Sequence, residues 1–148
     1  MDICIKVKKL RSDAKLPVYA TDGSAAADIC YAGDSDIVIA PGETAMVPSG
    51  LSISMGRCDV AAFIYARSGL ASKHGIAPAN CVGVIDSDYR GEIMVSIFNQ
   101  SDQPQEIADG ERVAQLVITP FLSAEFVETD RLSDTARGEG GFGSTGKK

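Results

Sequence analysis

The sequence predicts an all-β protein, built as a sandwich, barrel or jelly roll of short strands. Three observations predict this fold class. Apolar and polar residues alternate with a period of two, which is typical of strands with one buried face. The alternating stretches are short, and turn-forming residues separate them at close, regular spacing.

The strand-like stretches run through most of the chain. They lie, in order, at residues 3–8, 37–39, 51–55, 60–65, 93–98 and 113–118. Turns rich in glycine, proline and aspartate fall between them, at residues 41–42, 48–50, 55–56, 89–91 and 109–110. Each stretch is therefore bounded by residues that favour a reversal of the chain.

Only residues 68–75 suit a helix, and for two turns at most. Ser68 is a good N-cap and Gly75 a good C-terminal stop. From Arg137 onward the chain is too rich in glycine to form a strand or helix of its own. We therefore expect one β domain over residues 1–136 and a flexible, glycine-rich arm over residues 137–148.

Length and charge limit the classes of protein. A chain of 148 residues suits one domain, and its net charge of −6 argues against a basic face that holds nucleic acid. No apolar run approaches the ~18 residues of a membrane helix, and the first residues lack the layout of a secretion signal. We expect a soluble cytoplasmic protein without membrane or nucleic-acid partners.

The cysteines do not indicate a metal site. Cys4, Cys30, Cys58 and Cys81 lie far apart, and the chain has one histidine. Zinc sites usually combine closely spaced cysteines and histidines, so we expect buried free thiols instead.

The arm contains residues that suit a phosphate. Residues 138–143 match G-x-G-x-x-G, but no strand precedes them and no helix follows, so a dinucleotide fold is not indicated. Arg137, Ser144 and Thr145 flank the glycines, and Phe142 is the only aromatic residue of the arm. The segment is either a solvated linker or a lid that binds a phosphate and stacks on a base.

Arg67 and Ser68 follow a predicted strand at the start of the predicted helix. Free N–H groups at a helix N-terminus bind phosphate, so this junction is a candidate phosphate site. The alternative is a simple serine cap beside an arginine in a surface ion pair.

Asp86 directly follows the apolar residues 82–85, where we expect it to be partly shielded from water. Such a carboxylate is a candidate general base. An Asp/Tyr/Gly hairpin turn would explain the residues that follow it without any function. Asn80, shortly before, offers an amide donor and acceptor that suit a base edge.

Two further positions are less specific. Asp28 ends a run of small residues, where a helix cap or a turn is as good an interpretation as a metal-linked role. Gln115 interrupts an apolar strand and needs hydrogen-bond partners from the protein or from a ligand.

Five segments, taken in chain order, resemble the five motifs of the trimeric dUTPase family. They are the segments around Asp28, Arg67, Asp86 and Gln115, and the arm. The resemblance extends from about residue 20 to Gly146. Its most specific parts are residues 66–70, 83–91, 110–116 and 137–146.

The resemblance implies a jelly-roll homotrimer with three active sites at subunit boundaries. In each site, the first, second and fourth motifs of one chain meet the third motif of a neighbour and the arm of the remaining chain. It also implies hydrolysis of dUTP to dUMP and pyrophosphate with Mg²⁺, which keeps uracil out of DNA and supplies dUMP for dTTP synthesis. An enzyme related to dCTP deaminase and a non-catalytic nucleotide-sensing trimer are the alternatives.

Residue roles follow from matching positions in the family motifs. The resemblance implies that Asp86 activates the attacking water and that Tyr89 packs under the deoxyribose. Mg²⁺ is expected mainly on the substrate phosphates, with Asp28 reaching it through water. The other residues expected to bind substrate are Asn80, Gly83, Val84, Ile85 and Met94 for uracil, Arg67, Ser68, Gly69 and Gln115 for the phosphates, and Arg137, Phe142, Gly143, Ser144 and Thr145 from the arm.

Overall fold

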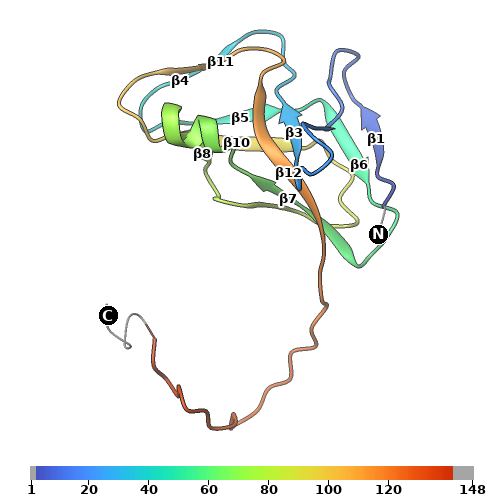
Figure 1. Ribbon diagram of the computed structural model, residues 1–148, viewed down its shortest axis with the longest axis vertical. Helices are drawn as coiled ribbons and strands as arrows, with labels where there is room; N and C mark the ends of the chain where they lie inside the picture. Colours follow the sequence, from blue (N-terminus) through green and yellow to red (C-terminus); the bar gives the residue numbers. More distant parts are fainter. Residues whose placement is uncertain (1–2, 142–148) are drawn as a thin grey trace.

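The computed structural model describes residues 3–141, and over that range it consists of twelve short strands and one helical turn (Figure 1). The all-β prediction, with one short helix, is confirmed. The strands are β1 Lys6–Lys9, β2 Val18–Tyr19, β3 Ala27–Cys30, β4 Ile37–Ile39, β5 Thr44–Pro48, β6 Leu51–Ser54, β7 Val60–Tyr65, β8 Ile76–Pro78, β9 Gly83–Ile85, β10 Met94–Asn99, β11 Gln105–Ile107 and β12 Arg112–Pro120, and the helical turn η1 is Leu70–His74.

The strands form antiparallel sheets whose neighbours are mostly distant in sequence. The largest sheet has the order β2-β3-β12-β7-β9, and a second has the order β5-β10-β8. β1 pairs with β6, and β4 pairs with β11. This connectivity, in which successive strands pass between sheets, is that of a jelly roll.

The two larger sheets enclose one apolar core. Leu116 of β12 and Ile64 of β7 are neighbours in the five-stranded sheet, and both point inward. They belong to the same buried cluster as Val47 of β5 and Val95 of β10. Because side chains alternate along a strand, the adjacent positions of β12 and β7 face outward. This outward face carries part of the candidate site.

The local pattern predicts β4 and β7 with their correct bounds, and β1, β6, β10 and β12 with shifted ends. It does not indicate β2, β3, β5, β8 or β11. β3 illustrates the reason, because its ladder partner β12 lies more than 80 residues later in the chain. The four residues of β3 follow a run of small residues and are too few for their alternation to reveal a strand from the sequence alone.

The helical turn differs in detail from the prediction. Gly75 ends it as expected, with φ 67°, and donates its N–H to the carbonyl of Leu70, which makes the turn π-helical. The predicted Ser68 cap is wrong, because Gly69 precedes the turn and no side chain caps it. The Ala71 N–H already donates to the Arg67 carbonyl, which places Ser68 inside helical structure.

Residues 86–93 do not form the hairpin that the sequence suggests. β9 pairs with β7, whereas β10 pairs with β5 and β8. The segment between them therefore crosses from one sheet to the other, and we refer to residues 86–93 as the crossover loop.

All four cysteines are free thiols, but the expectation that they are buried is wrong. Cys4, Cys58 and Cys81 are exposed, and Cys30 is half-buried. Partial burial raises the pKa of the Cys30 thiol.

After β12 the chain leaves the sheets and runs away from the body of the molecule (Figure 1). Its large apolar side chains are exposed along this path, among them Leu122 at 96 % and Phe126 at 95 %. The domain boundary at residues 136 and 137 remains a prediction. Within residues 3–141, no helix has the length and apolar character needed to cross a membrane.

Candidate active site

Asp28 joins two arginines at one edge of the outward face of the five-stranded sheet. Its Oδ1 accepts a hydrogen bond from Arg67 Nε at 3.0 Å, and its Oδ2 accepts one from Arg112 Nη1 at 3.0 Å. Arg67 Nη1 also donates to the Arg112 carbonyl at 3.1 Å. The side chains of Asp28 and Arg67 are only 12 % and 23 % exposed, so this pair is weakly screened, whereas Arg112 is 55 % exposed. We call these three residues the arginine cluster.

Three strands bring the arginine cluster together. Asp28 lies in β3, Arg67 follows the end of β7, and Arg112 begins β12, where a bulge interrupts the pairing with β3. Gln115 lies on β12 between Asp28 on one side and Tyr65 on the other. Two guanidinium groups and one carboxylate leave a net positive charge, which suits a phosphate.

The residues predicted for this region lie close together. Arg67 and Asp28, predicted separately, are in direct contact, and Gln115 lies beside them. Ser68 and Gly69 are exposed immediately after Arg67. Arg112 was not predicted. Its signal was weak, since a charged residue that opens a strand is usually only solvated.

A second group of predicted residues lines a cleft at the end of β9. The cleft has a volume of about 170 Å³ and is lined by Val84, Ile85, Asp86, Tyr89, Glu92, Ile93 and Met94. Asp86 is exposed, so the expectation that it is shielded is wrong for the single chain. The strand ends at the buried Ile85, and the crossover loop then carries the carboxylate outward.

Hydrogen bonds within the crossover loop fix the position of Tyr89. Its N–H donates to the Asp86 carbonyl at 3.1 Å, and its hydroxyl donates to the Glu92 carbonyl at 3.0 Å. The ring passes close to Gly91, where an added Cβ would lie 2.3 Å from the Tyr89 hydroxyl oxygen. Glycine at position 91 is therefore needed for this placement of the ring.

Asn80 lies on the turn that precedes β9. A Cβ added to Gly83 would lie 3.6 Å from Asn80 Nδ2, so the amide is close to the start of that strand. Between them, Cys81 has φ 62° and is the only non-glycine residue in the described range with positive φ. Its N–H donates to the Pro78 carbonyl at 3.0 Å, which closes the turn.

The described part of the arm does not reach either group of residues. Arg137 Nε donates to the Gly140 carbonyl at 2.8 Å, and Arg137 is exposed. Phe142, Gly143, Ser144 and Thr145, which were predicted to bind substrate, lie outside the described residues.

The arginine cluster and the cleft are far apart on the same sheet. β3 and β9 are separated by β12 and β7, which corresponds to about 14 Å at the usual strand spacing. Asp28 is level with Tyr65, and Ile85 is level with Ala62, so Asp86 lies about 13 Å further along the strands. Within residues 3–141, no hydrogen bond or ion pair connects the cluster to Asp86. One chain therefore does not bring its own Asp86 to its own arginine cluster.

Comparison with known proteins agrees with the motif resemblance. Residues 12–146 match the family model described as dUTPase. The chain is 50 % identical over 146 residues to the deoxyuridine 5'-triphosphate nucleotidohydrolase of Desulfitobacterium hafniense (strain DSM 10664 / DCB-2), with 97 % of each chain covered. It is 49 % identical over 148 residues to the protein of the same name from Thiobacillus denitrificans, with both chains fully covered.

The fold agrees as well. The dUTPase of Staphylococcus bacteriophage 80alpha, solved with dUpNHpp, superposes with a TM-score of 0.84 at 26 % identity, covering 97 % of this chain and 98 % of that one. With its jelly-roll sheets, its ordered motifs and these matches over nearly its whole length, the chain belongs to the dUTPase family of deoxyuridine 5'-triphosphate nucleotidohydrolases.

Proposed function

We propose that the protein hydrolyses dUTP to dUMP and pyrophosphate in a site shared between subunits, with Asp86 as the general base. The observation that carries the proposal is the separation of two chemically different halves on one sheet. One half is a cationic cluster that suits phosphates, and the other is an open cleft with a carboxylate and an aromatic ring.

Asp86 would take a proton from a water molecule as the water oxygen attacks the α-phosphorus. The new phosphorus–oxygen bond forms while the bond from the α-phosphorus to the oxygen that bridges to the β-phosphorus breaks, and pyrophosphate leaves. The exposed position of Asp86 gives water direct access, and a positioned general base contributes about 10²–10⁴-fold to a rate. Arg67, Ser68, Gly69 and Gln115 would hold the phosphates on the other half of the site.

The residues present fit an Mg²⁺ ion that is bound mainly by the substrate. Within residues 3–141, no three side chains of the histidine, cysteine or acidic types are placed to hold a metal. A carboxylate has about four acceptor positions, and Asp28 uses two on its arginines, which leaves room for a metal-bound water. When bound, Mg²⁺ would supply positive charge on the phosphates.

The cleft suits a deoxyribonucleoside. Tyr89 would lie under the deoxyribose. Its hydroxyl is bonded to the Glu92 carbonyl and its ring lies close to Gly91, and a ring fixed in this way would leave little space for a 2′-hydroxyl. The uracil would be bound by Asn80, by the backbone of Gly83, Val84 and Ile85, and near Met94. Fixed amide donors and acceptors reject a base whose edge does not match them.

A homotrimer would bring the two halves together. Each site would combine the arginine cluster of one subunit with the cleft of a neighbour, because the two halves of one chain are too far apart. The outward face of the five-stranded sheet supports such an assembly, since Val84 is 62 % exposed and Tyr65 is 39 % exposed there. Exposed apolar side chains of this kind are suited to an interface.

The arm of the remaining subunit would close the site. Arg137, Gly143, Ser144 and Thr145 would hold the γ-phosphate, and Phe142 would stack on the uracil. Among the described residues, none after Ile118 belongs to the apolar core, which supports a role for the arm other than folding. Truncation after Ala136 should therefore leave the melting temperature and the subunit assembly unchanged but remove most of the activity. Normal turnover by the truncated protein would contradict this role.

The direct test of the function is a panel of nucleotides. The protein is incubated with dUTP, UTP, dCTP and dTTP in the presence of Mg²⁺, and pyrophosphate and base products are measured. We expect rapid pyrophosphate release from dUTP and far slower release from the others. Release of ammonia from dCTP would indicate an enzyme related to dCTP deaminase, and binding of dUTP without turnover would indicate a nucleotide sensor.

In cells, the proposed reaction would take place in the cytoplasm, keep uracil out of DNA and supply dUMP for dTTP synthesis.

A further inference from the structure

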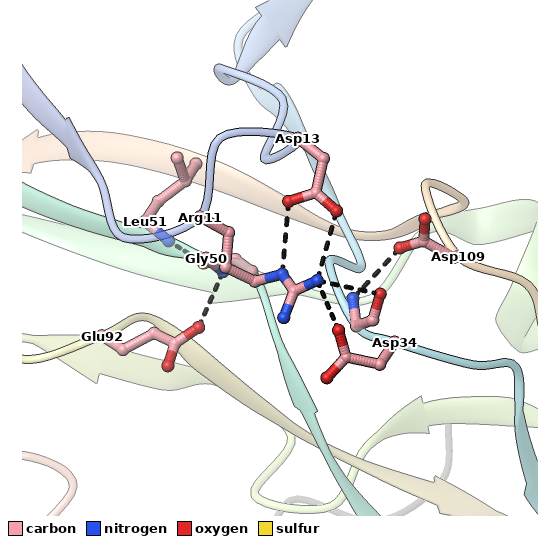
Figure 2. Close-up of polar contacts among 9 residues, drawn as sticks. Arg11, Asp13, Asp34, Gly50, Leu51, Glu92 and Asp109 are labelled. Carbon is pink, nitrogen blue, oxygen red and sulfur yellow. Dashed lines mark hydrogen bonds and ion pairs between the residues drawn. The ribbon is translucent and has the colours of Figure 1, made fainter.

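The turn between β5 and β6 connects the N-terminal segment to the crossover loop. The Gly50 carbonyl accepts a hydrogen bond from the Leu10 N–H at 2.7 Å, and the Gly50 N–H donates to Glu92 Oε1 at 2.7 Å. Figure 2 shows Glu92 on one side of Gly50 and Arg11 on the other. The crossover loop is therefore bonded to a turn that is itself held from the opposite side.

The position of this turn is tightly defined. Gly50 has φ 67°, and a Cβ added there would lie 2.8 Å from the Ala14 Cβ and 3.2 Å from the Ala32 Cβ. Leu51 is fully buried against these two alanines. Arg11 ties the surrounding loops together, with its Nη2 at 2.7 Å from Asp34 Oδ1 (Figure 2). The turn therefore offers a fixed reference point for whatever binds to it.

Other bonds join the same turn and β6 to the end of the crossover loop. The Ser49 N–H donates to the Ile93 carbonyl at 3.1 Å, and the Ile93 N–H donates to the Leu51 carbonyl at 2.8 Å. The Ser52 hydroxyl donates to the Arg90 carbonyl at 2.7 Å. Of the crossover loop side chains, Glu92 is the one that reaches the turn, and it does so with a charged acceptor, which forms a stronger bond than a neutral one.

We propose that Glu92 is a positioning residue for the hydrolysis of dUTP. This inference rests on the proposed function. The Glu92 carboxylate, bonded to the Gly50 N–H, fixes the loop that carries Asp86 and Tyr89, and so sets where the base and the sugar-binding ring stand in the cleft. A misplacement of about 1 Å in such a site can lower the rate about 10²-fold. Glu92 thereby affects catalysis and sugar selectivity through its neighbours.

Three variants of the full-length protein test this proposal. Glu92→Ala removes the bond, and Glu92→Gln keeps an oxygen acceptor of the same reach. Glu106→Ala, an exposed glutamate on β11, is the matched control. For each variant, kcat and KM are measured with dUTP and with UTP, the melting temperature is recorded, and hydrogen exchange is followed over residues 86–93.

We expect Glu92→Ala to lower kcat for dUTP about tenfold and to reduce the preference for dUTP over UTP, because the loop loses its hydrogen bond to the Gly50 N–H. Hydrogen exchange over residues 86–93 should become faster. Glu92→Gln should recover most of the lost rate and protection, and Glu106→Ala should match the parent protein.

Three results would overturn the proposal. They are a Glu92→Ala protein with unchanged kcat and selectivity, one that differs only in melting temperature, and a Glu92→Gln protein as slow as Glu92→Ala. If the parent protein releases no pyrophosphate from dUTP, the proposed function fails instead. Hydrogen exchange then still decides whether Glu92 fixes the loop.

Discussion

The arginine cluster and the cleft prepare their chemistry in opposite ways. In the cluster, the Asp28 carboxylate is nearly buried and uses both oxygens on arginines of the same chain. In the cleft, the Asp86 carboxylate is exposed and, within residues 3–141, makes no side-chain hydrogen bond or ion pair. The fold of one chain thus completes the half that we propose binds the phosphates, whereas the half with the proposed base stays open, as a site shared with a neighbouring subunit would require.

The largest expected effect on turnover comes from the cleft, at Asp86. Asp86→Asn should lower turnover of dUTP about 10²–10⁴-fold, because an amide cannot accept the proton of the attacking water. The melting temperature and the affinity for dUTP should stay close to those of the parent protein, since the side chain has no partner to lose. Steady-state kinetics and calorimetric titration measure these values, with Asp88→Asn, an exposed aspartate of the same loop, as control. Lost affinity with normal turnover would place the base elsewhere.

Mixed assemblies test whether the two halves come from different subunits. Asp86→Asn and Arg67→Ala chains should each be nearly inactive alone. Co-expressed at equal levels, they should regain about a quarter of the parent activity, because random assembly gives that share of sites an intact cluster and an intact base. The measurement is the specific activity of the co-expressed protein purified as one pool, with tags of different charge used only to verify that both chains are present in equal amounts. Activity no higher than that of the single variants would mean that each site is built within one chain.

A substitution in the arginine cluster should lower stability as well as rate. Asp28→Ala removes the shared partner of Arg67 and Arg112, and we expect a loss of about 1–3 kcal/mol in the free energy of unfolding. We also expect kcat/KM to fall about tenfold or more, since Arg67 is no longer held toward the phosphates. Urea unfolding and kinetics measure both values, with the exposed Asp22→Ala as control. Unchanged stability would mean that the ion pairs do not hold the cluster together.

The smallest effect is expected at the outer arginine. The Arg112 side chain is 55 % exposed, so Arg112→Ala should cost less than about 1 kcal/mol in stability and lower kcat/KM only about threefold. The loss should shrink as salt is added, because salt screens exposed charges. Kinetics at low and high ionic strength check this expectation. A loss as large as that of Asp28→Ala would show that Arg112 is as important as Arg67.

Much of this molecule can be predicted from its sequence, but unevenly. The alternating residues of β6 and the turn glycines carry local signals, and the fold class follows from them, whereas the motif order comes from the resemblance to the dUTPase family. β3 is too short to carry a clear signal of its own, and its pairing with β12 is visible only in the structure. The contact between Asp28 and Arg112 depends on that pairing, and for this reason Arg112 was missed.

The crossover loop shows the same limit. Its aspartate, tyrosine and glycine fit a hairpin, and only the pairing of β9 and β10 with different sheets reveals that the segment passes between them. Glu92 had no visible role in the sequence because its partner, Gly50, lies 42 residues earlier. Likewise, the apolar residues before Asp86 suggested shielding that a single chain does not provide.

The turn that carries Asn80 suggests how a more heat-resistant version of this enzyme could be made. Cys81 keeps a left-handed backbone that disfavours any residue with a Cβ by about 1–2 kcal/mol, while glycine adopts it without strain. Relief of this strain would raise the free energy of unfolding, although part of the increase is lost because glycine makes the unfolded chain more flexible. Replacing Cys81 by glycine would also remove an exposed, oxidisable thiol, so that the same change would benefit shelf life as well as thermal tolerance.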